Sequence, residues 1–165
     1  ESFLITVPGE RKDVLQSSLL ATGLQDGADE MITFSRLQQG WPLANDILEK
    51  TLPQEVGLND RTISFTKGCY LGQETVARLD ALGHVNRRLA VLTIEQGEST
   101  TVGDNVASNN EVVAQVTSVA CLGKQGATLA MAIVPLKSMQ QEANLTVAGK
   151  AANVVSTVLL NPPMT

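Results

Sequence analysis

The spacing of hydrophobic positions in the first half of the chain changes several times, which predicts short strands and helices in one mixed segment. Apolar residues run together or alternate where strands are expected, and they recur every three or four positions where helices are expected. Glycines follow two of the periodic segments, in positions that end helices. The pattern predicts strands at 3–7 and 30–35, helices at 14–19, 43–52 and 72–82, and a loop at 67–71.

The second half of the chain, beyond Gly83, has short apolar runs separated by turns that contain glycine, asparagine or lysine. The strand-like runs are 88–94, 112–122, 127–134, 144–147 and 153–160. Several short strands at this spacing are typical of a small antiparallel barrel or sandwich. We therefore predict an α+β fold with two parts, an α+β body at residues 1–84 and an antiparallel β part at residues 85–165.

Composition narrows the classes of function. The 165 residues are 43% hydrophobic and 18% charged, which is typical of a globular protein. A net charge of −5 and an aromatic content of 3% disfavour direct nucleic-acid binding, which needs basic surfaces or stacking rings. No apolar run approaches the about 20 residues of a membrane helix, and no secretory leader is visible. The expectation is a cytoplasmic protein without direct contact to nucleic acid or membrane.

The residues around Cys69 indicate that its thiol is chemically reactive. Cys69 stands between Gly68 and Gly72, directly before a predicted helix. The partial positive charge of a helix N-terminus and the ammonium of Lys67 both favour a thiolate, and hence a reactive thiol. The alternative is that Cys69 is a small packing residue in a tight turn. Metal binding is not expected, because two distant cysteines and a single histidine cannot supply four ligands.

The segment around this cysteine, Lys-Gly-Cys-Tyr-Leu-Gly-Gln-Glu at 67–74, resembles the Lys-Gly-Cys-Tyr-x-Gly-Gln-Glu signature of the folate-binding YgfZ family. These proteins are related to the T-protein, the aminomethyltransferase of the glycine cleavage system. Further elements resemble the family at 36–42, 53–58, 85–89 and 116–118. Because family members are considerably longer, we expect this chain to correspond to the C-terminal portion of such a protein.

The resemblance implies a fold, a cofactor and partners. The implied fold is a T-protein-like, ferredoxin-like α+β body followed by a small antiparallel β-barrel, and the implied cofactor is tetrahydrofolate. The family is associated with the maintenance of iron–sulfur enzymes, including those that thiolate tRNA, and with mitochondrial iron–sulfur assembly. Iron–sulfur client proteins are therefore the expected partners, and an organellar matrix is the alternative location.

The resemblance also assigns site residues. Cys69 is expected to be the functional thiol, assisted by its neighbours Lys67, Tyr70, Gln73 and Glu74. The residues expected on the folate side are Arg36, Gln38, Trp41 and Arg78. Gln38 stands where the family has a glutamate. Because an amide carries no charge, we expect weak binding of the pterin ring.

Structural roles are the alternative for several of these residues. In that interpretation Gln73 and Glu74 cap a helix, Arg78 pairs with Glu74 one turn away, and Trp41 anchors a turn. Arg36 is then a surface residue at the end of a strand.

Three functions remain open at this point. The first is a folate-dependent accessory factor for the maturation or repair of iron–sulfur enzymes, with a functional thiol at Cys69. The second is a T-protein-like one-carbon transferase that uses tetrahydrofolate. The third is a non-catalytic interaction module in which Cys69 is structural. Folate would be the bound small molecule under the first two.

Overall fold

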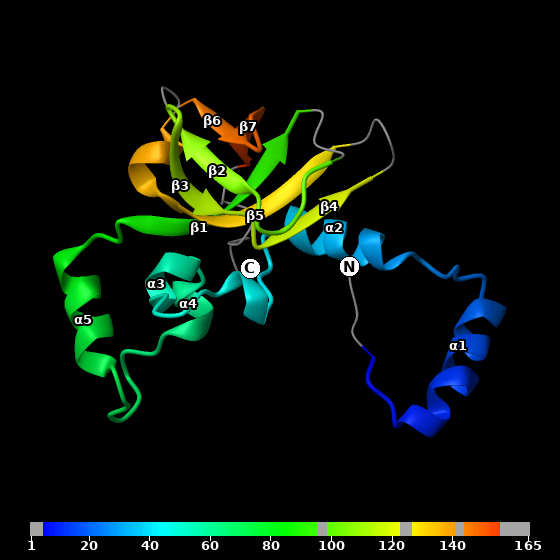
Figure 1. The fold of residues 1–165 in the computed structure, drawn as a ribbon. Helices are drawn as coiled ribbons and strands as arrows, with labels where there is room; N and C mark the ends of the chain where they lie inside the picture. The colour runs from blue at the N-terminus through cyan, green and yellow to red at the C-terminus, as the bar shows by residue number, and fades with distance from the viewer. Residues whose placement is uncertain (1–4, 96–98, 123–126, 141–143, 156–165) are drawn as a thin grey trace.

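The computed structural model describes residues 5–95, 99–122, 127–140 and 144–155, in which helices lie on one side of a curved sheet (Figure 1). The helices are α1 (Lys12–Ala21), α2 (Asp29–Gln38), α3 (Pro53–Val56), α4 (Asn59–Thr62) and α5 (Gln73–Leu82), and the short 3-10 helices are η1 (Gly9–Arg11), η2 (Ala44–Asp46) and η3 (Leu136–Met139). The strands are β1 (Arg87–Ile94), β2 (Asn105–Ser108), β3 (Glu111–Gln115), β4 (Ser118–Cys121), β5 (Thr128–Pro135), β6 (Leu145–Val147) and β7 (Lys150–Val155).

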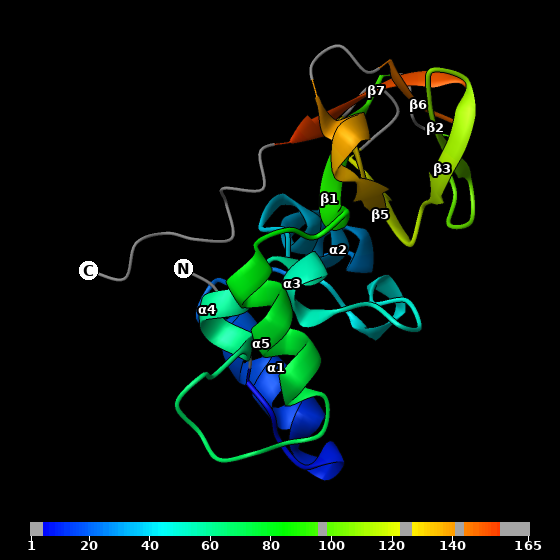
Figure 2. The ribbon, with the colours of Figure 1, turned by 90° about the vertical axis from the view of Figure 1, so that its left-hand side faces the viewer.

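The strands form one antiparallel sheet in the order β3-β2-β6-β7-β1-β5-β4. The long strand β1 is central: it pairs with β5 over its whole length, from Arg87 opposite Pro135 to Ile94 opposite Thr128, and with β7 over 91–94. The sheet curls round strongly, as the view in Figure 2 shows, into a half-barrel with β3 and β4 at its two edges. Twist and coiling of this kind follow from the right-handed twist of each strand.

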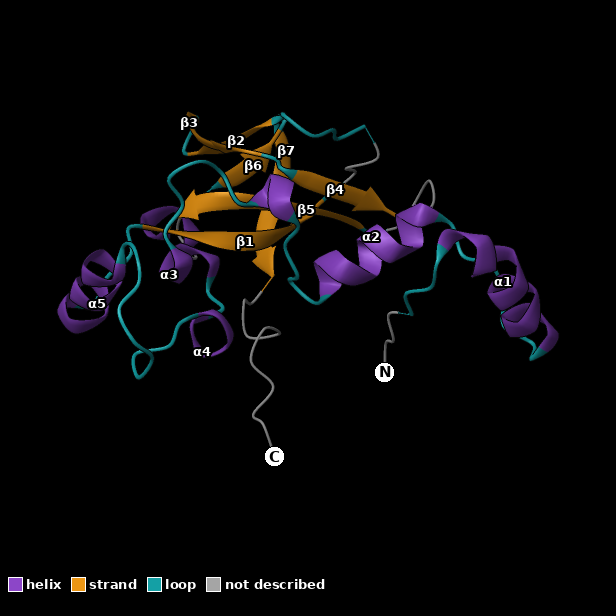
Figure 3. Ribbon diagram, turned by 90° about the horizontal axis from the view of Figure 1, so that it is seen from below, coloured by secondary structure: helices purple, strands orange, loops and turns teal. Residues whose placement is uncertain are grey.

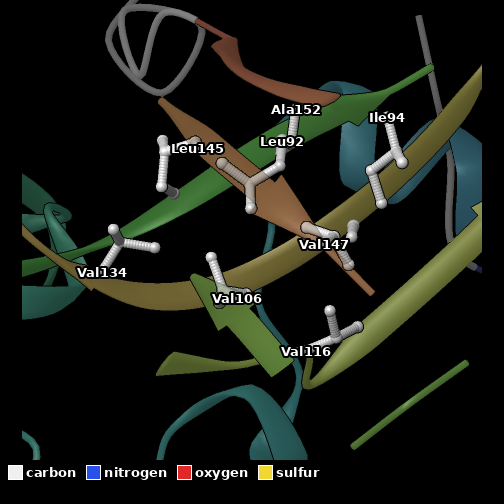
Figure 4. Close-up of a cluster of buried hydrophobic side chains, with 11 residues drawn as sticks. Leu92, Ile94, Val106, Val116, Val134, Leu145, Val147 and Ala152 are labelled. Carbon is white, nitrogen blue, oxygen red and sulfur yellow. The ribbon is translucent and has the colours of Figure 1, made fainter. Parts of the chain in front are cut away.

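Both faces of the central strands are buried, each in its own hydrophobic cluster. On β1 the side chains of Leu89 and Val91 belong to the cluster between sheet and helices, and those of Leu92 and Ile94 belong to the cluster inside the half-barrel. Strand β5 alternates in the same way, because successive side chains of a strand point to opposite faces. Figure 4 shows the inner cluster, which β2, β6 and β7 complete with Val106, Leu145, Val147 and Ala152.

Helix α2 is the main cover of the outer face of the sheet. Phe34 and Leu37, which lie one turn apart on α2, are buried against residues of β1, β4 and β5. Val56 and Leu58, at the end of α3 and just beyond it, join the same cluster. In contrast, α1 contains no buried residue, and Figures 1 and 3 place it at one end of the molecule, away from the sheet.

Helix α5 is bounded by two glycines with left-handed backbone conformations. Gly72 before it has a φ of 85° and Gly83 after it has a φ of 89°, values that other residues adopt only with strain. Val76 is buried on this helix, and its carbonyl oxygen accepts a 2.9 Å hydrogen bond from Nε2 of Gln54 on α3.

The sequence predictions are confirmed where periodicity was strongest. Helices are present as α1 and α5, a loop spans 67–71, and β1, β5 and β6 lie where strands were predicted. The predicted strand at 112–122 is divided into β3 and β4, β7 begins three residues early at Lys150, and β2 was not predicted. Residues 3–4 and 156–160 of two predicted strands lie outside the described residues, and residues 5–7 form no strand.

Two other predictions were wrong. Residues 30–35 belong to helix α2, because Phe34 and Leu37 form a helical stripe that the sheet buries, whereas the alternating residue Ile32 is exposed. Residues 43–52 hold only the short helix η2, and the next helix begins at Pro53. The described residues 5–86 contain no strand, so the ferredoxin-like body is not confirmed. The coarser prediction, a mixed fold with a barrel-like antiparallel sheet, is confirmed.

None of the helices in the described part of the chain is long and apolar enough to cross a membrane.

A buried carboxylate connects the helical part to the sheet. Asp46, whose side chain is 0% exposed, accepts hydrogen bonds from Nη1 of Arg36 at 2.9 Å, from the backbone N–H of Leu43 at 2.9 Å and from Oγ1 of Thr117 at 2.6 Å. Nη2 of Arg36 donates to Oγ of Ser118 on β4 at 2.9 Å. These contacts hold α2, η2 and the start of β4 together.

We expect Asp46→Ala to lower the free energy of unfolding by about 3 kcal/mol, because it leaves the nearly buried guanidinium of Arg36 without its counter-charge. Urea denaturation followed by circular dichroism measures the change. Glu49→Ala removes an exposed carboxylate from the same segment and serves as the control, with an expected change within about 0.5 kcal/mol. Equal effects of the two substitutions would contradict a supporting role for Asp46.

Candidate functional site

Cys69 lies on an exposed loop between α4 and α5, which Figure 2 shows reaching out from the two helices. The residues that precede it, from Phe65 to Gly68, are also exposed. The loop is held locally, since the backbone N–H of Lys67 donates a 3.3 Å hydrogen bond to Oγ of Ser64. The exposure of Cys69 disagrees with the interpretation of this residue as a packed core cysteine.

The neighbours of Cys69 form a small ordered group at the start of α5. The ammonium of Lys67 lies 4.4 Å from the centroid of the Tyr70 ring, a cation–π contact. Oε1 of Gln73 accepts a 3.3 Å hydrogen bond from the backbone N–H of Tyr70. Gln73 therefore has the structural role of holding the turn that precedes the helix, and Lys67 directs its charge toward the ring of Tyr70.

Glu74 and Arg78 lie on the exposed surface of α5. Their side chains are one turn apart on the helix, and the described structure has no ion pair between them. Helix α5 begins four residues after Cys69, so its N-terminus lies at the end of the loop, where the N–H of Gln73 donates a 3.2 Å hydrogen bond to the carbonyl oxygen of Tyr70. The arrangement offers an accessible thiol near a helix N-terminus, which suits nucleophilic or redox chemistry of sulfur.

Arg36 is a nearly buried residue of α2 and not a surface residue at the end of a strand. Its side chain is 11% exposed, and besides Asp46 and Ser118 it donates a 2.9 Å hydrogen bond to the carbonyl oxygen of Trp41. The guanidinium thereby positions the Gly40–Trp41 turn. Trp41 itself is 48% exposed, and Gln38 is exposed as well.

The two groups of predicted residues are not brought together. Arg36, Gln38 and Trp41 lie at and just beyond α2, whereas Cys69 and Arg78 belong to the loop and helix α5. Figures 1 and 3 place α2 and α5 toward opposite sides beneath the sheet. Within the described residues, the surface around Trp41 that was expected to bind folate is therefore separate from the loop that carries the thiol of Cys69.

Other buried polar residues join the two parts of the chain and were not predicted. Glu55 on α3 accepts hydrogen bonds from Nε and Nη2 of Arg87 on β1 at 2.8 and 3.2 Å, and one from the backbone N–H of Leu52 at 2.9 Å. The hydrogen bond to Glu55 raises the pKa of Arg87 above its ordinary value. The sequence does not indicate that Asp46 contacts Thr117 or that Glu55 contacts Arg87, because the two residues of each pair are distant along the chain.

Among the side chains that the structure describes, no three His, Cys, Asp or Glu residues lie close enough to hold a metal ion.

We expect Cys69 to react with iodoacetamide at least ~10-fold faster than Cys121, because Cys69 is exposed whereas Cys121 is partly covered in β4. Mass spectrometry of tryptic peptides after timed quenching measures both rates. Cys69→Ser should remove the fast reaction and leave the melting temperature within a few degrees, since an exposed thiol contributes little packing. Cys121→Ser is the matched control and should leave the fast reaction in place. A slower reaction at Cys69 would contradict its accessibility.

Comparison with known proteins supports the resemblance seen in the sequence. No protein-family profile matches the chain. Over 143 residues, 81% of this chain, it is 31% identical to the tRNA-modifying protein YgfZ of Aliivibrio fischeri, of which the match covers 43%. Over 58 residues, 34% of this chain, it is 48% identical to the tRNA-modifying protein YgfZ of Colwellia psychrerythraea, of which the match covers 18%.

An uncharacterized protein of Haemophilus influenzae is 28% identical over 108 residues, which are 64% of this chain and 38% of that protein. The chain thus spans less than half the length of the curated relatives that it matches. The two YgfZ matches support a YgfZ-like family for this chain.

Proposed function

We propose that this chain acts as part of a folate-dependent accessory factor for the maturation or repair of iron–sulfur enzymes, including enzymes that thiolate tRNA. The observation that carries the proposal is the exposed position of Cys69 within a sequence that resembles the family signature. Similarity to two tRNA-modifying YgfZ proteins supports the same role. Cys69 is the functional thiol in this proposal, and the cytoplasm is its place of action.

The neighbouring residues have distinct tasks in the proposal. Lys67 and Tyr70 hold the loop through their cation–π contact, and Gln73 fixes the backbone of Tyr70, so that Cys69 is presented at a constant place. Glu74 adds a carboxylate to the exposed first turn of α5, where it is available to a client protein. An accessible thiolate of this kind can attack a disulfide of a client protein, forming a mixed disulfide while the other client cysteine leaves as a thiolate, or it can take up an electrophile.

Folate is proposed to use the exposed surface beside α2. Trp41 offers an exposed ring for stacking, Gln38 offers an amide that can both donate and accept, and Arg36 positions Trp41 through its carbonyl oxygen. Arg78 lies on α5 and would meet a bound folate only through a long glutamate tail. Because Gln38 is exposed and uncharged, this surface offers the pterin little electrostatic attraction, which supports the expectation of weak binding.

The thiol is tested in cells that lack the complete protein. We expect the complete protein with Cys69→Ser to restore less than about a tenth of the wild-type level of thiolated tRNA, because serine cannot undergo thiol exchange. Liquid chromatography with mass spectrometry of digested tRNA measures the modification. Cys121→Ser is the matched control and should restore the full level. Full restoration by Cys69→Ser, at equal protein abundance, would refute the proposal and leave Cys69 with no chemical role.

The cofactor is tested by calorimetric titration of the chain with tetrahydrofolate under anaerobic conditions. We expect a dissociation constant weaker than about 10 μM, since Gln38 supplies no charge for the pterin ring. Trp41→Ala should weaken binding further, and because Trp41 is the single tryptophan of the sequence, no second indole ring can replace it. A sub-micromolar complex that survives Trp41→Ala would place the folate surface elsewhere.

A further inference from the structure

A small polar cavity lies where α3, α4, α5 and the start of β1 meet, apart from both surfaces described above. Its volume is about 130 Å³, and the polar residues that line it are Gln54, Asn59, Asp80, His84 and Arg88. These elements follow one another along the chain, and the hydrogen bond from Nε2 of Gln54 to the carbonyl oxygen of Val76 connects α3 to α5.

Three of the polar atoms that line this cavity are buried and have no hydrogen-bond partner among the described residues. They are Oε1 of Gln54, Oδ1 of Asn59 and Nε of Arg88. Gln54 is only 5% exposed, and because its Nε2 is bound to Val76, its Oε1 must serve as a free acceptor. Buried polar groups are nearly always hydrogen-bonded to protein, water or ligand, so three such atoms around one cavity identify it as a site for a polar partner.

The chemistry of the three atoms defines what that partner must offer. Two amide oxygens require hydrogen-bond donors, and the guanidinium of Arg88 requires an acceptor, best a negatively charged one. The lining also includes the carboxylate of Asp80, so the cavity presents one negatively charged group beside the guanidinium of Arg88. A ligand with an ammonium group and a carboxylate, and no net charge, satisfies all of these groups.

The size of the cavity limits the ligand further. A volume of 130 Å³ corresponds to about four water molecules, at about 30 Å³ each. Pockets for drug-sized ligands are several times larger, about 300 to 1,000 Å³, so this cavity suits a ligand much smaller than a folate. We propose that this cavity binds a small zwitterionic α-amino acid, with its ammonium toward Gln54 and Asn59 and its carboxylate toward Arg88.

The proposal is tested by titrating the ¹⁵N-labelled chain with glycine and following its amide signals by nuclear magnetic resonance. We expect saturable shifts of the signals of Gln54, Asn59 and Arg88. Acetate, methylammonium and acetamide each carry only part of the required chemistry, so they should bind at least about tenfold more weakly. The proposal would be overturned if acetamide or acetate saturated the amide shifts at the same concentration as glycine. It would also be overturned if glycine, serine and alanine gave no saturable shift up to about 50 mM.

Two substitutions keep the test independent of a single variant. Arg88→Met removes the guanidinium, and Asn59→Leu removes an amide oxygen while keeping the branched shape of the side chain, and each should weaken glycine binding at least about tenfold. Arg11→Met, on the exposed η1, is the matched control and should bind glycine as the wild type does. Unchanged binding in a folded Arg88→Met or Asn59→Leu variant would overturn the proposal. Neither outcome depends on Cys69.

Discussion

The carboxylate of Asp46 has no contact with solvent and receives hydrogen bonds from α2, from the backbone before η2 and from the residue that precedes β4. A buried charge without partners would be costly, so the three donors must all be in place when the protein is folded. Since Arg36 and Thr117 come from different parts of the chain, their convergence on Asp46 determines where α2 lies on the sheet. The position of the Gly40–Trp41 turn follows from this, through the contact between Arg36 and the carbonyl oxygen of Trp41.

The sheet needs a helical cover because its central strands are apolar on both faces. One face encloses the inner cluster when the sheet curls into a half-barrel, and the other packs against α2 and α3. Helix α3 also binds β1, through Glu55 and Arg87, and α5, through the hydrogen bond from Gln54 to Val76. The exposed loop that carries Cys69 ends at α5, so the accessible thiol lies on a loop that α5 and α3 connect to the sheet.

Local pattern was sufficient for several elements of this protein. Gly72 and Gly83, with the period of Val76 and Leu79 between them, identify α5, and the long apolar runs of β1 and β5 identify strands because both faces are buried. The signature around Cys69 could also be found from the sequence, since it is a continuous segment. Each of these features can be recognised within a short continuous segment, and the tertiary contacts agree with it.

Tertiary structure decided the rest. The alternation of residues 30–35 favours a strand, but the sheet buries Phe34 together with Leu37, and that spacing requires a helix. The role of Arg36 depends on Asp46 and Ser118, and the cavity beside α5 depends on polar residues from several elements. The spacing of polar residues along the sequence does not indicate which distant residue each of them will contact. Such sites arise only when long-range packing brings the atoms within hydrogen-bond distance and removes them from water.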